Sequence, residues 1–243
     1  MRFPLRLTAD LTLGLAVRSL RLKRKRPLIL NLLASGNANS YKSPIVWIGG
    51  HEPLNLPETP RVVNFLAAAG RHVFLPTTGL LLRRRIHEFQ PSQRLHLTIR
   101  FDGAETSHDQ RVGQRGAFRD ALESVRTAKL SGFFLCAQLV LHSPREATEL
   151  EHLHGELINL DFDGYLISLA APASASHELR RSISDLRKRL LSRRWALLST
   201  LLDSVVSPSV ASVVNAQHPS PRLPRERAPQ LPPRGREESV QAP

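Results

Sequence analysis

The stretch 95-LHLTIRFDGAETSHDQRVGQRGAF-118 decides the fold of this chain. Its first seven residues form an apolar run that predicts a buried strand, and Asp102-Gly103 ends the strand in a polar loop. We expect a helix to start near Gly116 and to run to Leu130. The stretch is therefore one β-loop-α unit, and in α/β folds the loops that follow strands carry the chemistry.

The polar side chains of this loop are candidates for a functional site. They are Asp102, Glu105, His108, Asp109 and Arg111. A solvated loop without any function would have the same composition. The pattern alone leaves both interpretations open.

Apolar runs and helical patterns alternate along the rest of the chain. The expected strands are residues 28–33, 45–48, 72–75, 95–101, 133–141 and 164–168, and the expected helices are 59–70, 82–89, 116–130 and 145–160. This alternation predicts parallel strands joined by right-handed crossovers. Six strands suit an α/β fold, a partial (β/α)6 TIM-like barrel, with basic helical extensions at both ends.

Composition divides the chain into four regions. They are a basic amphipathic segment (1–26), a partial barrel (27–176), a C-terminal helical segment (177–206) and a Pro/Arg-rich tail (207–243) that we expect to be disordered. The net charge of +13 comes from the ends, because residues 1–26 carry +7, residues 177–243 carry +6 and the barrel is neutral. This distribution indicates contact of the end segments with an anionic surface, although arginine-rich codon usage would give the same excess.

Residues 8–22 predict a short amphipathic helix. Leu11, Leu15, Leu20 and Leu22 form its apolar side, and the cationic run 21–26 follows. Such a helix would lie on an anionic membrane surface or close over the domain as a lid. No uncharged apolar stretch of about eighteen residues exists, so we expect no membrane-spanning helix. A cytoplasmic protein, peripheral to the membrane if this helix binds lipid, is the default.

The loops after the second, third and fourth strands form an ordered series of motifs. They read Gly49-Gly50-His51-Glu52-Pro53-Leu54, Thr77-Thr78-Gly79, and Phe101-Asp102-Gly103 followed by His108-Asp109, Arg111 and Gly116. In this order, and at strand ends over residues 27–172, the series resembles the core of radical S-adenosylmethionine (radical SAM) enzymes. Segments 73–82, 99–103 and 163–168, with the opening MRFPL, resemble the hopanoid-modifying branch, which adds an adenosyl group to a membrane triterpene.

The resemblance implies a set of cofactor-binding residues. They are Gly49, Gly50, Glu52 and Pro53 around the ammonium group of S-adenosylmethionine (SAM), Thr77 and Thr78 near its pocket, and Asp102 and Gln138 on the nucleoside side. A carboxylate suits the cation, and glycine allows close approach. Two departures weaken the match, since Thr78 stands where asparagine is usual and His51 stands where the second glycine would be or is an insertion.

A larger departure concerns the [4Fe-4S] cluster that the family carries. Its Cys-x3-Cys-x2-Cys loop after the first strand is replaced here by ASGNANSYKSPI, and the first helix is missing as well. Asn37, Asn39 and Ser40 are poor ligands for such a cluster, and His51 offers one nitrogen. Cys136, the only cysteine, lies in a later apolar run, where it is most simply a small buried residue. We therefore expect neither a cluster, nor a metal site, nor a catalytic residue for radical formation.

Three hypotheses follow. The chain is a degenerate radical SAM protein, a pseudoenzyme whose residual role is to bind SAM or lipid; or the missing loop is an artefact of the reading frame and the true product is an enzyme. The third hypothesis is a non-enzymatic peripheral membrane or scaffold protein whose basic ends contact an anionic membrane surface or a triterpene lipid. We expect no nucleic-acid partner, because aromatic residues make up only 5% of the chain and the barrel carries no recognised motif.

Overall fold

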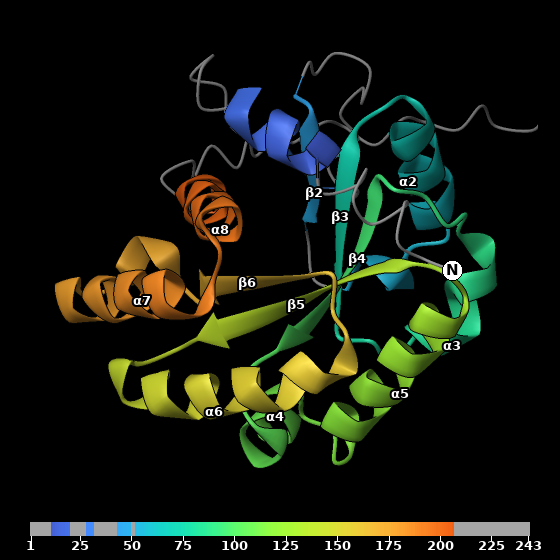
Figure 1. Ribbon diagram of the computed structural model, residues 1–243. Helices are drawn as coiled ribbons and strands as arrows, with labels where there is room; N and C mark the ends of the chain where they lie inside the picture. The colour runs from blue at the N-terminus through green and yellow to red at the C-terminus, as the bar shows by residue number, and fades with distance from the viewer. Residues whose placement is uncertain (1–10, 20–27, 32–42, 50–51, 207–243) are drawn as a thin grey trace, which may run out of the picture. The chain divides into compact units, whose positions relative to one another are not determined.

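The computed structural model describes residues 11–19, 28–31, 43–49 and 52–206, which form one compact unit (Figure 1). The expectations for the tail, for the loop at 32–42 with its missing helix, and for Leu20 and Leu22 fall outside these residues. They stay predictions.

Six parallel strands form one sheet in the order in which they occur along the chain. They are β1 (Leu28–Asn31), β2 (Ile45–Gly49), β3 (His72–Thr77), β4 (Leu95–Phe101), β5 (Phe134–Leu141) and β6 (Gly164–Leu169). A strand order without jumps is what repeated right-handed βα units give. The sheet curls into a partial barrel with flanking helices, so the fold class predicted from the sequence is confirmed (Figure 1).

Helices connect the strands. The α-helices are α2 (Thr59–Ala68), α3 (Leu82–Arg85), α4 (Glu105–Val112), α5 (Ala117–Leu130), α6 (Ala147–Leu157), α7 (His177–Leu190) and α8 (Arg193–Val206), and residues 11–19 are also helical. Short 3-10 turns are η3 (Pro53–Asn55), η4 (Ile86–Glu88), η5 (Pro144–Glu146), η6 (Ile158–Leu160) and η7 (Pro172–Ser174). Each expected strand within the described residues is present, and so are the connecting helices, except that the expected helix 82–89 is a four-residue α-helix followed by the 3-10 turn η4.

One correction concerns the stretch that decides the fold. The polar segment after β4 was expected to be a loop, but residues Glu105–Val112 form the helix α4. His108 is its single buried residue, so the segment shows none of the apolar periodicity by which helices are recognised. Gly113 ends α4 with a φ of 76°, a left-handed conformation that glycine adopts without strain.

Both faces of the sheet are buried, because alternate side chains of each strand point to opposite sides. The outer face packs against helices α2, α3, α5, α6 and α7, and it supplies the larger apolar core, which includes Val73, Leu97, Leu135 and Ile167. Toward the amino-terminal ends of the strands the inner face is mostly apolar, apart from the buried His72 and His96. There Ile45, Trp47, Phe74, Cys136 and Leu166 form a second core with helix 11–19 and α8.

Helix 11–19 shows which side of the amphipathic pattern the protein uses. Leu13, Ala16 and Val17 are buried in the inner core, whereas Leu11 is 61% exposed and Leu15 is 66% exposed. Two of the leucines expected on the buried side of a lid therefore face outward.

Helix α8 lies against the inner face and contacts both β6 and β1, the two edge strands of the sheet. Trp195 of this helix is buried at Gly164 and meets Phe74 edge-on, with ring centroids 6.5 Å apart. None of the described helices is both long and apolar enough to cross a membrane.

Candidate functional site

The carboxyl-terminal half of the inner face is polar, in contrast to the mostly apolar half below it. The side chains that reach it lie within or just after β2, β3, β4, β5 and β6, and hydrogen bonds hold two groups of them together. These are a Glu52–Thr78 pair, and a cluster of Arg100, Asp102 and His142. In an α/β sheet this edge is where ligands bind.

Glu52 and Thr78, which the resemblance placed at one pocket, are in direct contact. The Glu52 carboxylate accepts hydrogen bonds from the Thr78 backbone nitrogen at 2.8 Å and from the Thr78 hydroxyl at 2.9 Å. It also accepts a bond from the Leu54 backbone nitrogen at 3.2 Å, which caps η3. Glu52 is therefore fixed between the loops after β2 and β3, and its half-buried carboxylate keeps acceptor capacity for a cation.

The neighbours of this pair have structural roles. Pro53 is buried, and its carbonyl accepts a hydrogen bond from the Thr59 hydroxyl. Thr77 lies at the end of β3 on the helix side of the sheet, where its hydroxyl accepts a bond from the Gly79 nitrogen at 3.0 Å. Gly49 is the last residue of β2, while Gly50 lies outside the described residues.

Asp102 is the centre of the second group. Arg100 donates to its two oxygens at 2.8 and 2.7 Å, and the distance from His142 Nε2 to Asp102 Oδ1 is 2.8 Å. Burial favours the neutral acid, but the hydrogen bonds from His142 and Arg100 outweigh it and hold the pKa of Asp102 well below its usual range. Asp102 is therefore a buried carboxylate that orients one imidazole and one guanidinium.

A network of hydrogen bonds ties this cluster to the surrounding helices. Arg111 of α4 donates to the backbone carbonyl of Asp102 and forms an ion pair with Glu146 at 3.0 Å. Glu146 in turn accepts a bond from the backbone nitrogen of His142 at 3.3 Å. The loops after β4 and β5 are thereby held in one arrangement.

Gln138, the last of the residues implied by the resemblance, lies on the inner side of β5. Its amide donates to the Ser168 hydroxyl of β6 at 2.8 Å. The structure thus joins Glu52 with Thr78, Asp102 with His142, and Gln138 with Ser168, as three separate contacts at one edge of the sheet.

Sequence reasoning missed His142, Arg100 and Ser168. His142 is 40 residues from Asp102 along the chain, so their contact depends on the parallel pairing of β4 with β5. The position of His142 in the sequence could have identified it as a site residue. It directly follows an apolar run, in the same way that Asp102 follows its strand.

Three candidates of the segment after β4 serve the fold instead. His108 is buried, accepts a bond from the Asp102 nitrogen at 3.1 Å, and has its pKa lowered by burial. The Asp109 carboxylate accepts bonds from the Gly116 and Phe118 nitrogens, and these bonds lower its pKa. It therefore caps the amino terminus of α5, while Glu105 pairs with Arg119 at 2.7 Å.

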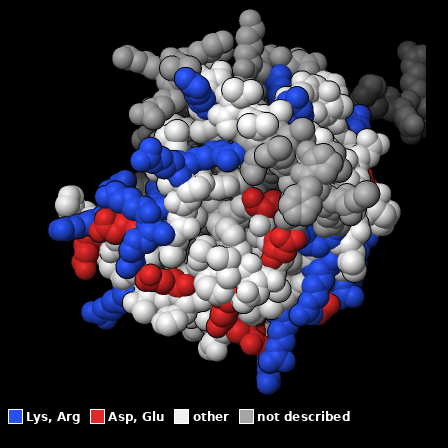
Figure 2. Space-filling view, viewed as in Figure 1, with Lys and Arg blue, Asp and Glu red and all other residues white. Residues whose placement is uncertain are grey.

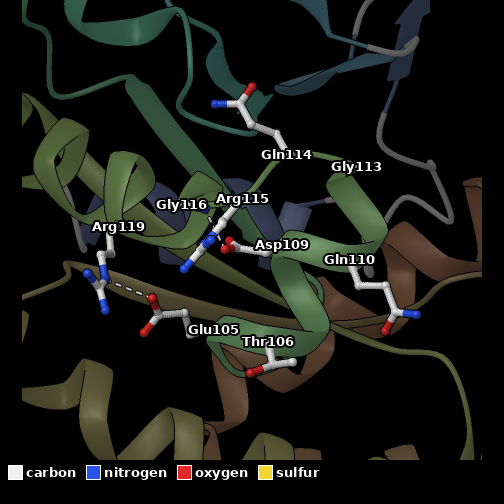
Figure 3. A pocket seen from close by; sticks show the side chains of 9 residues that line it. All are labelled: Glu105, Thr106, Asp109, Gln110, Gly113, Gln114, Arg115, Gly116 and Arg119. Atoms are coloured by element: carbon white, nitrogen blue, oxygen red, sulfur yellow. Dashed lines mark hydrogen bonds and ion pairs between the residues drawn. The ribbon is translucent and has the colours of Figure 1, made fainter.

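A shallow hollow of about 510 Å³ lies beside these residues (Figure 3). Residues of α4, of the following turn and of the start of α5 line it, and Figure 3 shows Glu105 and Arg119 paired across it. Asp109 occupies the free amides of α5, where an anion would otherwise bind. The hollow contains none of the polar groups of the inner face.

The residues present do not fit a [4Fe-4S] cluster. Cys136, the one thiol of the chain, is fully buried in the inner core and is remote in sequence from the loop that would bind iron. Within the described ranges no three His, Cys, Asp or Glu side chains lie close enough to hold a metal ion. A cluster of this kind needs at least three thiolates, and the chain has one.

Comparisons with known proteins give matches to parts of the chain. No family model matches. The curated protein "AdoMet-dependent heme synthase" of Methanosarcina barkeri (strain Fusaro / DSM 804) is 34% identical over 97 residues, which are 39% of this chain and 28% of that protein. Its name refers to AdoMet, which is SAM, the cofactor that the motif series implies. The match does not point to the hopanoid-modifying branch, and the chain spans little more than a quarter of its relative's length.

Solved structures with some similarity include TYW1 with a lysine-pyruvate adduct bound and archaeal TYW1. Their TM-scores are 0.46 and 0.44 at 18% and 17% identity; each match covers 60% of this chain, and 49% and 50% of the other chains. HMG-CoA lyase from Brucella melitensis follows with a TM-score of 0.40 at 9% identity, over 60% of this chain and 53% of that one.

Proposed function

We propose that this chain is a radical SAM-like partial barrel that binds SAM, or a related cationic adenosine derivative, without assembling the cluster that would cleave it. The observation that carries the proposal is the contrast between two parts of the site. Glu52 is oriented by Thr78 at the strand edge where the resemblance puts the SAM ammonium group, while the residues for iron are absent.

The chemistry of the inner face supports a nucleoside ligand. Asp102, Gln138 and Ser168 offer hydrogen-bond acceptors and donors of the kind that hydroxyl groups need, and Glu52 offers a negative charge to an ammonium or sulfonium group. The apolar core of Trp47, Phe74 and Leu166 lies beneath them on the same face. When bound, SAM would supply its cationic head to Glu52, and the chain would hold it without reacting.

Titration calorimetry with SAM tests the binding. We expect the wild-type chain to bind SAM and Glu52→Gln to bind it about tenfold more weakly, because a charge-assisted hydrogen bond contributes roughly 1.5–3 kcal/mol. Glu58→Gln is the matched control, since Glu58 is exposed and lies six residues away. Absence of binding to the wild type, or an equal loss in both variants, would contradict the proposal.

Anaerobic reconstitution with iron and sulfide tests whether the chain has lost cluster assembly and SAM cleavage. We expect no stoichiometric iron and no reductive cleavage of SAM. A brown protein that cleaves SAM would show that the chain is an enzyme.

We further propose that the chain is related to the hopanoid-modifying branch and contacts a membrane triterpene. The support for this proposal is the similarity of segments 73–82, 99–103 and 163–168 to that branch. Repeating the titration with neutral vesicles that contain a pentacyclic triterpene tests it, and vesicles without the triterpene that give the same signal would contradict it.

A further inference from the structure

Helix 11–19 has two apolar sides, and the fold uses only one of them. Leu13, Ala16 and Val17 pack into the inner core, whereas Leu11 and Leu15 are 61% and 66% exposed. These two leucines are four residues apart and therefore neighbours on the helix surface. Among the described residues the other large exposed apolar side chains are Phe65, Leu130 and Ile158, each on a different element.

Cations accompany the exposed pair. Arg18 is exposed and lies one turn beyond Leu15 on the same side of the helix. The next contribution comes from the start of α8, where Arg193 is exposed and the Arg194 guanidinium lies over Gly14, 3.7 Å from the position that a Cβ atom would take. In Figure 2 the described residues at the top of the face shown include Lys and Arg, and the Asp and Glu side chains in view lie lower.

The sequence around this helix is also strongly basic. Residues 1–31 contain eight Lys or Arg residues and one acidic residue, Asp10, in a chain whose central region is neutral. Exposed leucines surrounded by cations are the composition of helices that lie at the boundary of an anionic bilayer. We infer that Leu11, Leu15, Arg18, Arg193 and Arg194 form a docking surface for a membrane that contains anionic lipid.

Two other occupants fit these observations less well. A second copy of the chain, related by a two-fold axis, would place the cations of one surface against the same cations of the other, which is repulsive. A nucleic acid would satisfy the cations, but leucine side chains offer no stacking surface for bases. A bilayer satisfies both, because its headgroups attract the arginines while its acyl boundary takes up the leucines.

The inference is independent of the nucleoside site, since none of these residues belongs to the Glu52 or Asp102 groups. SAM-free protein therefore suffices for the experiment. A failure of SAM binding leaves the result for the membrane surface unchanged, and the reverse also holds.

Vesicle flotation with the full chain is the direct test. We expect binding to vesicles of about 30% phosphatidylserine in phosphatidylcholine, little binding to phosphatidylcholine alone, and weaker binding as sodium chloride is raised. The double variant Leu11→Ser/Leu15→Ser should bind vesicles at least tenfold more weakly, because burying each leucine side chain in the bilayer contributes about a tenfold gain in affinity. Leu130→Ser is the matched control, since Leu130 is 87% exposed on α5.

Circular dichroism melting shows whether the double variant still folds. If the double leucine variant does not fold, Arg18→Glu/Arg193→Glu replaces it. We expect these two charge reversals to lower the affinity for anionic vesicles by at least about 25-fold. Equal binding to both kinds of vesicle, binding that Leu130→Ser lowers as much, or no binding at all would overturn the inference. So would a dimer or a nucleic-acid complex that the leucine variant abolishes while vesicles stay unbound.

Discussion

Gly164 has the tightest surroundings of the glycines that the structure describes. A Cβ atom on this residue would lie 2.1 Å from Cζ2 and 2.3 Å from Cη2 of Trp195. These are indole atoms of a side chain that is only 8% exposed and packs against Phe74. The absence of a side chain at Gly164 therefore lets α8 approach β6.

Gly164→Ala tests this close approach. We expect the free energy of unfolding to fall by about 1–3 kcal/mol, the usual cost of overpacking a well-filled core. Urea unfolding measures it. Gly155→Ala is the control, because Gly155 is exposed within α6 and nothing lies within 4 Å of a Cβ there. That variant should gain about 0.5–1 kcal/mol, and a similar loss in both would contradict the role of Trp195.

At the scale of elements, Arg187 joins three of them. It lies on α7, its side chain is 8% exposed, and it donates to the Ile167 carbonyl of β6 at 2.9 and 2.6 Å. It also reaches α8, where it contacts the Ser199 carbonyl at 3.2 Å and Asp203 at 2.6 Å. Burial is the largest influence on both ions, lowering the pKa of Arg187 and raising that of Asp203.

Arg187→Leu should be strongly destabilising. It leaves the Asp203 carboxylate buried without its cation, which typically costs about 3–5 kcal/mol. The penalty should be smaller at pH 4.5 than at pH 7.5, because burial raises the pKa of Asp203 and protonation removes the charge that Arg187 no longer balances. Denaturant unfolding of variant and wild type at pH 7.5 and 4.5 gives both values. Lys188→Leu, at the neighbouring exposed position, should stay within about 0.5 kcal/mol; a constant penalty at both pH values would refute the explanation.

The strands and most helices could be predicted because their apolar runs are local. The run 95–101 was predicted with the bounds that β4 has in the structure. Helix α4 was missed because it buries only His108 and so carries no apolar period. The two faces of β2 and β3 could not be told apart, since Val46 and Val73 on one side are as apolar as Trp47 and Phe74 on the other.

The candidate site could be predicted only where motif order supplied the residues. Glu52 and Thr78 were placed together through the resemblance, and the structure joins them. His142 and Arg100 could not be found in this way, because their roles depend on the register of β4 against β5 and on side-chain direction. Leu11 and Leu15 were expected on one apolar side, but the sequence does not distinguish the buried side of a helix with two apolar sides.

At the scale of the whole molecule, buried histidines make stability depend on pH. His72 and His96 lie on the inner face with facing ring nitrogens 3.2 Å apart. Burial first, and then the nearby Arg94, lower the pKa of His72 to about 4. Burial first, and then His72, lower the pKa of His96 to about 3.

Acidification should therefore destabilise the fold well above the pH at which carboxylates titrate. In the unfolded chain both histidines bind a proton near pH 6.5. In the folded chain the same imidazoles stay neutral until the pH falls to about 4. Between these values the unfolded state binds up to two more protons, so the free energy of unfolding falls by roughly 2–3 kcal/mol per pH unit as the pH decreases.

Urea unfolding at pH 7.5, 6.0 and 5.0 measures this slope. His72→Phe/His96→Phe should make it shallower, with His108 still contributing a smaller slope, and His177→Gln, at an exposed position, should leave it unchanged. A wild-type stability that is constant between pH 7 and 5 would contradict the prediction.

The single thiol of the chain has a practical consequence. Cys136 is fully buried where helix 11–19 and α8 cover the inner face. A thiol reagent can reach it only when this covering detaches or the whole domain unfolds. The rate at which Cys136 is alkylated therefore measures how often the inside of the barrel opens to water.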